Sequence, residues 1–238
     1  MLLLLCFFAT VCCAIVPQAI AQPQSIYTND FTNGDTAGWT TRITDPEWQR
    51  RVRVGFSGNA GERVLGDFGD QKVRFRLDNI PPHDSITITF DFITIRSWDG
   101  NSSLYGPDLL EFKVDDTLAF RSSFSNTTYR QSFPNAYPAS HPARSGAVAF
   151  NSLGYIWRSP GLFVGPMDAT YRITRTVRHT APVANFHFNV FLDDPGQDIT
   201  NESWAIDNVA VSIIPHITPT TSPAPPAPPK KNVPGTGG

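Results

Sequence analysis

Cysteine is almost absent from this chain of 238 residues, and the three cysteines present lie close to its N-terminus. Cys6, Cys12 and Cys13 belong to the apolar run Met1–Val16, which is followed by Ala19-Ile20-Ala21, the small-x-small pattern that signal peptidase cuts. We therefore expect a signal peptide over residues 1–21 and a mature chain without cysteine. Such a chain has no disulfide, no thiolate metal site and no cysteine nucleophile.

Long apolar runs are lacking elsewhere in the sequence. A helix that spans a bilayer needs about 20 apolar residues, and Met1–Val16 is short for that length. A retained N-terminal anchor stays open as an alternative, because this run carries no Lys or Arg. We expect an exported protein without a transmembrane segment in the mature chain, secreted or associated with the cell envelope, and monomeric.

An excess of charge of either sign is missing as well, since the formal net charge is −2 and the isoelectric point is about 6.2. A nucleic-acid partner would require a strongly basic face, so nucleic acid is excluded from the expected partners. Glutamate is scarce, with only Glu47, Glu62, Glu111 and Glu202. They lie far apart, whereas glycosidases place two carboxylates on either side of one bond.

Other catalytic patterns are not found either. The sequence contains neither a G-x-S-x-G elbow nor an H-E-x-x-H zinc helix, and its five histidines are scattered. We therefore predict a protein that is not an enzyme. A glycan lyase or glycosidase that acts through Asp99 and Asp108 is kept as an alternative hypothesis.

No stretch of the mature chain has a helical period, and short alternating runs are separated instead by Gly, Pro, Asn and Asp. Leu109–Val114 and Leu118–Phe124 predict a hairpin across Asp115-Asp116. About a dozen such runs indicate an all-β fold, an antiparallel two-sheet jelly-roll sandwich that forms a single domain over residues 22–215. In a jelly roll the first and last strands pair, which would bring Phe31 near Val209.

Two predicted strands change the parity of their apolar residues. In Ser85–Ile95 the apolar set changes from Phe90 and Phe92 to Ile93, and in Ser203–Ile213 it changes at Asp207-Asn208. Such a change indicates either a β-bulge or a strand that is buried on both faces.

Two other stretches show little alternation. Ser125–Asp168 contains many prolines and several aromatic residues, and long irregular segments within a domain are often functional. Residues 216–238 are rich in Pro and Thr, which predicts a disordered, solvated tail that acts as a spacer.

The stretch Ile93–Asp108, ITIRSWDGNSSLYGPD, holds the densest set of groups able to bind a ligand. Trp98 and Tyr105 flank its polar turn and are the best candidates for exposed rings on which a sugar stacks, with Asp99 and Asn101 as polar partners. Further aromatic candidates are Tyr129, Tyr137, Tyr155 and Trp157.

The same turn is also a candidate calcium site. Asp99, Asn101 and Asp108 offer hard oxygen ligands, and Gly100 allows the sharp turn that a calcium cage needs. The spacing is not that of an EF-hand, and a turn without a metal remains the alternative.

Motifs at both ends of the predicted domain carry a family resemblance. Asn29-Asp30-Phe31-Thr32-Asn33-Gly34 with Gly38-Trp39 resembles the opening of jelly rolls of the carbohydrate-binding-module, laminin-G-like and MAM types. Glu202–Val209, ESWAIDNV, resembles their closing strand, and SWDGN with Gly106-Pro107-Asp108 is similar to a recurrent pattern of exported bacterial proteins. The resemblance covers most of residues 22–215 and implies a jelly roll.

In carbohydrate-binding modules of this type, a structural calcium often sits between the first and last strands. The resemblance therefore implicates Asp30 and Asp207 as metal ligands, although Asp30 stands where the family usually has the longer Glu. In the alternative interpretation, Asp207 only caps a bulge by accepting backbone amides.

These observations support a secreted, calcium-stabilised module that binds carbohydrate or another extracellular surface without catalysis. A structural or adhesive protein of the wall, matrix or envelope, without affinity for saccharides, is the second hypothesis. In a eukaryotic host, the sequons at Asn101, Asn126 and Asn201 would be surface glycan sites.

Overall fold

The computed structural model describes residues 21–42, 54–56, 61–159, 161, 163–192 and 198–216, which belong to one compact unit, Ile20–His216. The predicted signal peptide and Pro-rich tail lie outside the described residues, apart from Ala21 and His216. Among the described residues, no helix has the length and apolar character to cross a membrane.

The described residues form strands and no helix. The strands are β1 (Gln24–Asn29), β2 (Trp39–Arg42), β3 (Val54–Phe56), β4 (Arg63–Phe68), β5 (Lys72–Leu77), β6 (His83–Arg96), β7 (Leu109–Val114), β8 (Thr117–Ser123), β9 (Ala149–Phe150), β10 (Ile156–Ser159), β11 (Phe163–Pro166), β12 (Asp168–Arg178), β13 (Ala184–Phe191) and β14 (Glu202–Pro215).

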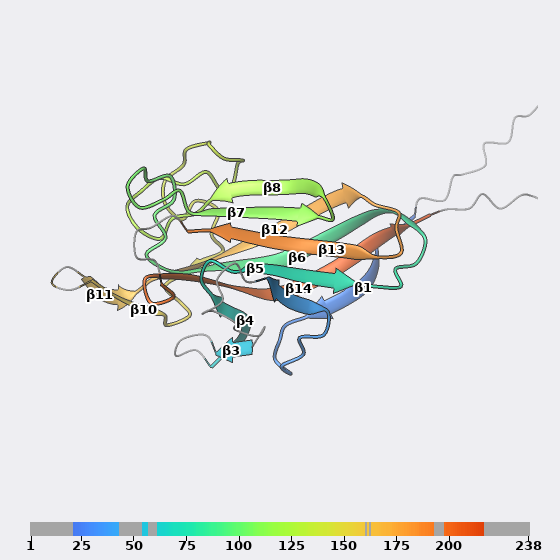
Figure 1. Ribbon diagram of the computed structural model, residues 1–238, viewed down its shortest axis with the longest axis horizontal. Helices are drawn as coiled ribbons and strands as arrows, with labels where there is room; N and C mark the ends of the chain where they lie inside the picture. Colours follow the sequence, from blue (N-terminus) through green and yellow to red (C-terminus); the bar gives the residue numbers. More distant parts are fainter. Residues whose placement is uncertain are drawn as a thin grey trace, which may run out of the picture. The chain divides into compact units, whose positions relative to one another are not determined.

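These strands build two antiparallel sheets, whose strands lie over one another in Figure 1. Sheet A has the order β3-β4-β14-β6-β12-β9, with β1 also paired to β14, and sheet B has the order β2-β5-β13-β7-β8. The chain crosses repeatedly between the sheets, from β1 in A to β2 in B, and finally from β13 in B to β14 in A. The predicted all-β jelly-roll sandwich is confirmed by this pairing.

The first and last strands pair as the jelly roll requires. Asn29 of β1 lies opposite Val209 of β14. Phe31, two residues after Asn29, is fully buried in the same core cluster as Val209. The predicted hairpin is present too, because Val114 and Thr117 are partners across Asp115-Asp116.

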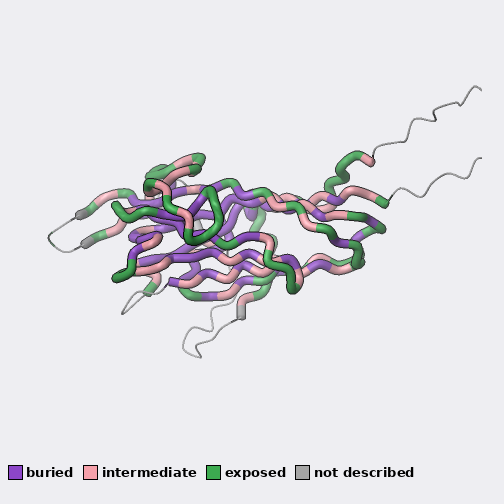
Figure 2. Tube along the Cα trace, turned by 90° about the horizontal axis from the view of Figure 1, so that it is seen from above, coloured by how far each residue is buried: buried purple, intermediate pink, exposed green. Residues whose placement is uncertain are grey.

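The two changes of parity have different causes. Strand β6 pairs with β12 without a break in register, and its residues from Phe90 to Ile95 are all buried. Phe92 faces the main core, while Ile93 and Ile95 belong to a second apolar cluster that Leu153 and Tyr155 complete. This part of the strand is therefore buried on both faces. Figure 2 shows that buried residues run through the interior of the molecule, whereas exposed residues gather in the loops at its edges.

In β14 the change of parity is a bulge. The register against β6 shifts between Asp207 and Ala210, and Asn208 has a positive φ of 49°. Asn is one of the few residues that adopts this backbone conformation at low cost. Of the two causes predicted for a change of parity, β14 therefore has the bulge and β6 has the burial on both faces.

The irregular stretch 125–168 contributes both a loop shell and a hairpin. Its hairpin, β10 and β11, pairs Ile156 with Pro166 and forms no contact in register with sheet A or B. Aromatic rings dominate the core between the sheets, where Phe90 contacts Phe112 and Phe188 at centroid distances of 5.2 and 5.0 Å.

Candidate functional site

The turn after β6 is organised around Asp108, which is fully buried. Its Oδ2 accepts hydrogen bonds from the backbone amides of Asp99 and Gly100, and the Asp108 amide donates to the Gly100 carbonyl at 3.0 Å. Gly100 has φ +60°, and a Cβ at this position would collide with the Arg130 carbonyl. The glycine is therefore required both for its backbone conformation and for the close approach of the 130 loop.

Asn101 ties this turn to the long loop that follows β8. Its amide nitrogen donates to the Ala139 carbonyl at 2.9 Å, and its Oδ1 accepts from the hydroxyls of Ser123 and Ser132. Its backbone amide donates to the Arg130 carbonyl at 2.7 Å. The Asn101 side chain thus joins the two loops, and both ends of its amide group are hydrogen-bonded within the protein.

A second connector, Gln131, lies deeper and is fully buried. Its Oε1 accepts from the amides of Ser125 and Arg144 and from the Tyr171 hydroxyl, at 2.9 to 3.1 Å. Its Nε2 donates to two backbone carbonyls. Sequence reasoning missed this residue, because a single glutamine between polar neighbours gives no local signal of burial.

The prediction that Trp98 presents an exposed ring is wrong. Its side chain has 0% exposure, its Nε1 donates to the Ser203 carbonyl at 2.7 Å, and its ring packs edge-on against Phe92 and Phe124. The physical reason is the burial of β6 on both faces, which carries the residues just after it into the core. Trp98 therefore cannot serve as a sugar platform.

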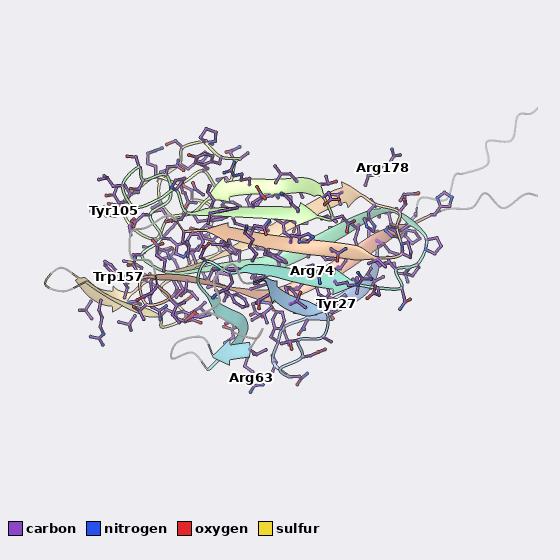
Figure 3. All side chains as sticks on the ribbon, viewed as in Figure 1. Tyr27, Arg63, Arg74, Tyr105, Trp157 and Arg178 are labelled. Atoms are coloured by element: carbon purple, nitrogen blue, oxygen red, sulfur yellow. The ribbon has the colours of Figure 1, made fainter. Side chains whose placement is uncertain are left out.

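Tyr105, by contrast, is 46% exposed and lies near a second exposed ring, Tyr129. The ring centroids are 6.4 Å apart with an interplanar angle of 59°. Leu104, 70% exposed, adjoins them in sequence. Figure 3 shows Tyr105 among the loops at the end of the sandwich opposite Arg178. The structure thus brings one predicted residue together with Tyr129, which the sequence offered only as a lesser candidate.

The donor set of Asp99, Asn101 and Asp108 does not fit a calcium ion. Oδ1 of Asp99 accepts from the Thr127 hydroxyl at 2.6 Å, Oδ2 of Asp108 accepts backbone amides, and Oδ1 of Asn101 accepts hydroxyls. These oxygens face N–H and O–H donors, whereas a calcium ion needs several oxygens converging on one point. The arrangement of these oxygens therefore does not fit the loop calcium site predicted from the sequence.

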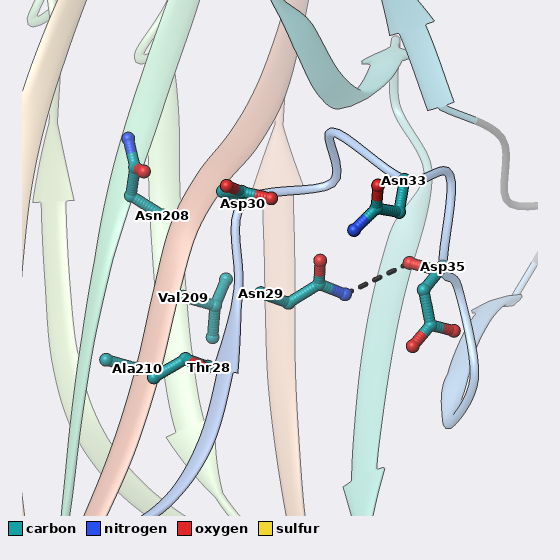
Figure 4. A pocket seen from close by; sticks show the side chains of 8 residues that line it. All are labelled: Thr28, Asn29, Asp30, Asn33, Asp35, Asn208, Val209 and Ala210. Atoms are coloured by element: carbon teal, nitrogen blue, oxygen red, sulfur yellow. Dashed lines mark hydrogen bonds between the residues drawn. The ribbon is translucent and has the colours of Figure 1, made fainter.

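The bulge in β14 lies beside a polar cleft of about 490 Å³. Figure 4 shows its lining, with Asn33 and Asp35 on one side, Asn208 on the other and Asp30 between them, while Asn29 donates a hydrogen bond to the Asp35 carbonyl. Asp30 is exposed and accepts the Thr32 amide at 3.0 Å. The oxygens are of the kind calcium prefers, but no group of three or more His, Cys, Asp or Glu side chains in the described part of the chain is arranged to hold a metal.

Asp207, the other residue implied by the resemblance, is buried next to this cleft. Its Oδ1 accepts the Asn208 amide at 2.7 Å, so it caps the bulge as the alternative interpretation predicted. Burial, with a smaller contribution from the negative charges of Glu62, Asp91 and Asp30, raises the pKa of Asp207 to about 7 against the lowering effect of the Asn208 amide. Asp91 itself is paired with Arg172 at 2.8 Å and is therefore partly compensated.

Of the three sequons, Asn126 contradicts the expectation of a surface site. It is buried, and its amide nitrogen donates to the carbonyls of Thr94 and Arg96. The amide nitrogen of Asn101 is likewise bonded within the protein, while Oδ1 of Asn201 accepts from Ser97 at 2.8 Å. A glycan on Asn126 is incompatible with this fold, because the nitrogen that would carry it is enclosed.

Comparison with known proteins gives no matching family model and no matching curated protein. Among solved structures the chain is similar to the family 22 xylan-binding domain of Xyn10C from Paenibacillus barcinonensis, with 10% identity and a TM-score of 0.41 over 84% of this chain and 100% of that one. It is also similar to a family 27 carbohydrate-binding module that recognises mannan, with 15% identity and a TM-score of 0.39 over 81% and 99%.

A third similar structure is the K3 cleaved adhesin domain of Lys-gingipain from Porphyromonas gingivalis, with 12% identity and a TM-score of 0.31 over 79% of this chain and 98% of that one. Each of these three similarities is a likeness between chains and carries no further conclusion. The fold stated above rests on the chain's own strand pairing.

Proposed function

We propose that this protein is a secreted, non-catalytic module that binds carbohydrate through the loops at one end of the sandwich, with Tyr105 and Tyr129 as the contact surface. The single observation that carries the proposal is the pair of exposed rings held on a hydrogen-bonded loop shell. Sugars stack on exposed aromatic faces, and a rigid platform loses little conformational entropy on binding.

The loops beneath the rings support this proposal. The Ser102 hydroxyl oxygen fixes the backbone at Tyr105, because it accepts a hydrogen bond from the Tyr105 amide N–H at 3.1 Å. Arg130, next to Tyr129, donates to the hydroxyl and the carbonyl of Ser140 at 2.7 and 3.0 Å. Tyr105 is therefore held within its own turn, and the residue next to Tyr129 is held by a contact with Ser140, 10 residues further along the chain than Arg130. Asp99 and Asn101 act as positioning residues of this platform rather than as ligand contacts.

The test is a glycan array followed by affinity measurement on the best ligand. Tyr105→Ala and Tyr129→Ala should each weaken binding about tenfold, equal to about 1.4 kcal/mol, which lies within the range of one aromatic stacking contact. Tyr105→Phe keeps the ring and should bind like wild type. Phe150→Ala removes an equally exposed ring from β9 and serves as the control.

If no saccharide binds, and if the protein instead co-fractionates with wall or matrix material, the structural or adhesive alternative replaces this proposal. Equal binding by wild type, Tyr105→Ala and Tyr129→Ala would move the site elsewhere. Turnover of a polysaccharide that is lost in Asp99→Asn or Asp108→Asn would support the enzymatic alternative, which the burial of both carboxylates disfavours.

Calcium at the cleft between β1 and β14 is part of the same proposal. Asp30 and Asp207 would hold the ion with amide oxygens such as those of Asn29 and Asn208, and the ion would compensate the negative charge that raises the pKa of Asp207. Its effect would be structural, because it would join the first strand to the last.

A further inference from the structure

The outer face of sheet B carries a second cleft, of about 540 Å³. None of its lining residues comes from the loops around Tyr105 and Tyr129. It crosses β2, β5, β13 and β7, four strands that span about 14 Å at the usual spacing of about 4.8 Å. Thr40, Arg74, His187 and Lys113 form one row across it, because each is the register partner of the next. Lys72 and Asn189 form part of the next row.

Charges of opposite sign are separated within this cleft, because Asp115 and Asp116 line it at the β7–β8 turn whereas Lys72 and Arg74 stand on β5. Lys113 is paired with Glu111 at 2.9 Å, and both oxygens of Asp115 are used, by Asn185 and by His179. Arg74 and Lys72 have no carboxylate within ion-pair distance among the described residues. Successive outward residues of β5 lie about 7 Å apart, so these two cations stand side by side on one face.

His187 lies between the two cations and the acidic turn. Burial lowers the pKa of His187, the positive charges of Arg74 and Lys113 lower it too, and the negative charges of Asp115 and Asp116 raise it. The net shift is downward, so its imidazole is mostly neutral near pH 7 and can exchange hydrogen bonds with hydroxyl groups. The amide of Asn189 and the hydroxyl of Thr40 add further groups that bind hydroxyls.

An aromatic platform is missing from this cleft. None of the exposed large apolar side chains of the described residues lies on β2, β5, β13 or β7. The ring of Phe191, at the end of β13, is covered by the Lys72 ammonium at 5.4 Å from its centroid. A neutral sugar would therefore find no stacking surface here, whereas a ligand that carries negative charge and hydroxyl groups would match the lining.

We propose that this cleft is a binding site for an acidic polysaccharide, whose carboxylate or sulfate groups pair with Arg74 and Lys72 while its hydroxyls contact Asn189 and His187. Arg74 presents the planar guanidinium that binds such oxyanions in a bidentate manner. Figure 3 shows Arg74 over the middle of sheet B, away from Tyr105. The site does not depend on the loop-end platform, so the two can be tested separately.

The test measures binding of the full chain to polygalacturonate and to its methyl ester, which has the same backbone with the charge removed. Dextran sulfate against dextran forms a second arm that distinguishes sulfate from carboxylate. We expect binding to at least one anionic polymer, loss of about tenfold or more with its neutral counterpart, and weakening by salt, because exposed ion pairs are screened.

The variant Lys72→Ser with Arg74→Ser should bind the anionic polymer about tenfold more weakly than wild type. Its control is Arg158→Ser with Arg178→Ser, which removes the same net charge from two exposed residues of β10 and β12 and should bind like wild type. The exchange Arg74→Lys keeps the charge but loses the bidentate geometry, so its affinity should lie between those of wild type and the double variant.

Three results would overturn the proposal: binding to neither anionic polymer, equal binding to charged and neutral polymers, or equal loss in the two double variants. Circular dichroism and thermal melts of all variants show whether they are folded. Tyr105→Ala, measured in parallel, should leave this binding unchanged, so a failure of the loop-end proposal and a failure of this one give different patterns.

Discussion

Asp207 is the residue whose environment departs most clearly from what its type prefers. A carboxylate favours water or a cation, yet this one is buried in the bulge of β14 and faces the charges of Glu62, Asp91 and Asp30. Its pKa is raised from 3.8 to about 7, and burial is the main cause. The folded protein therefore binds a proton that the unfolded chain has already released.

This shift predicts a loss of stability as the pH rises. Between about pH 4 and pH 7 the native state holds more protons at Asp207 than the unfolded state, so the free energy of unfolding falls through this window and levels off above it. Asp207→Asn keeps an oxygen that can accept the Asn208 amide and has no charge. In EDTA it should melt above wild type at about pH 8 and close to wild type at about pH 4.

A control for this prediction is Asp78→Asn, since Asp78 is exposed and paired with Arg76 on the surface at 2.8 Å. Its melting temperature relative to wild type should change little over the same window. A parallel pH dependence of Asp207→Asn and wild type would contradict the assignment of the shift to Asp207.

At the scale of elements, the two sheets are joined at one end by a chain of hydrogen bonds between buried histidines. Nδ1 of His83, in β6, donates to the Pro81 carbonyl at 2.7 Å. Nε2 of His83 and Nδ1 of His179 are 2.7 Å apart, and Nε2 of His179 lies 3.1 Å from the Asp115 carboxylate in the β7–β8 turn. The link therefore runs from sheet A to sheet B through the end of β12.

Removing this link should destabilise the fold. His179→Leu leaves the buried Nε2 of His83 without its partner and takes one hydrogen bond from the partly exposed Asp115 carboxylate, which should cost about 1–3 kcal/mol in the free energy of unfolding, measured by urea titration. His187→Leu, on the outer face of sheet B, should change that free energy by less than about 0.5 kcal/mol. Similar values for both variants would show that the link contributes nothing beyond packing.

At the scale of the whole molecule, the pairing of β1 with β14 closes the sandwich, and the proposed calcium lies at this closure. A calcium ion present at 100 times its dissociation constant would add about 2.7 kcal/mol, or roughly 5–10 °C in melting temperature for a domain of this size. Thermal melts with calcium and with EDTA measure it. The shift should shrink in Asp30→Ala and persist in Asp99→Ala, and no shift in wild type would end the proposal.

The core explains why so much of the fold could be predicted. Strand residues such as Ile86, Ile88 and Phe90 alternate with polar ones because one face of β6 meets the opposite sheet there. The hairpin at Asp115-Asp116 was equally predictable, because Asp tolerates the positive φ of 50° found at Asp115. Both signals are local, so they survive in the sequence without knowledge of the fold.

The candidate site was harder to predict, because exposure is not a local property. Trp98 and Tyr105 stand on the same turn and look equivalent in the sequence, yet one has no exposed surface and the other keeps almost half of its own. The difference comes from residues distant in the chain, since Phe124 and the Ser203 carbonyl enclose Trp98.

By itself, then, the sequence determined the strand periods, the absence of cysteine after Cys13, the lack of a helical hydrophobic period in residues 22–215, and the oxygen-rich and aromatic composition of the Ile93–Asp108 turn. These follow from residue types and their spacing. Only the tertiary structure decided which aromatic rings face solvent, that Asp99, Asn101 and Asp108 hold loops together, and that Arg74 meets His187 and Lys113 across three strands. The physical reason is that burial and charge depend on which distant segments pack together, and the packing of two sheets sets this.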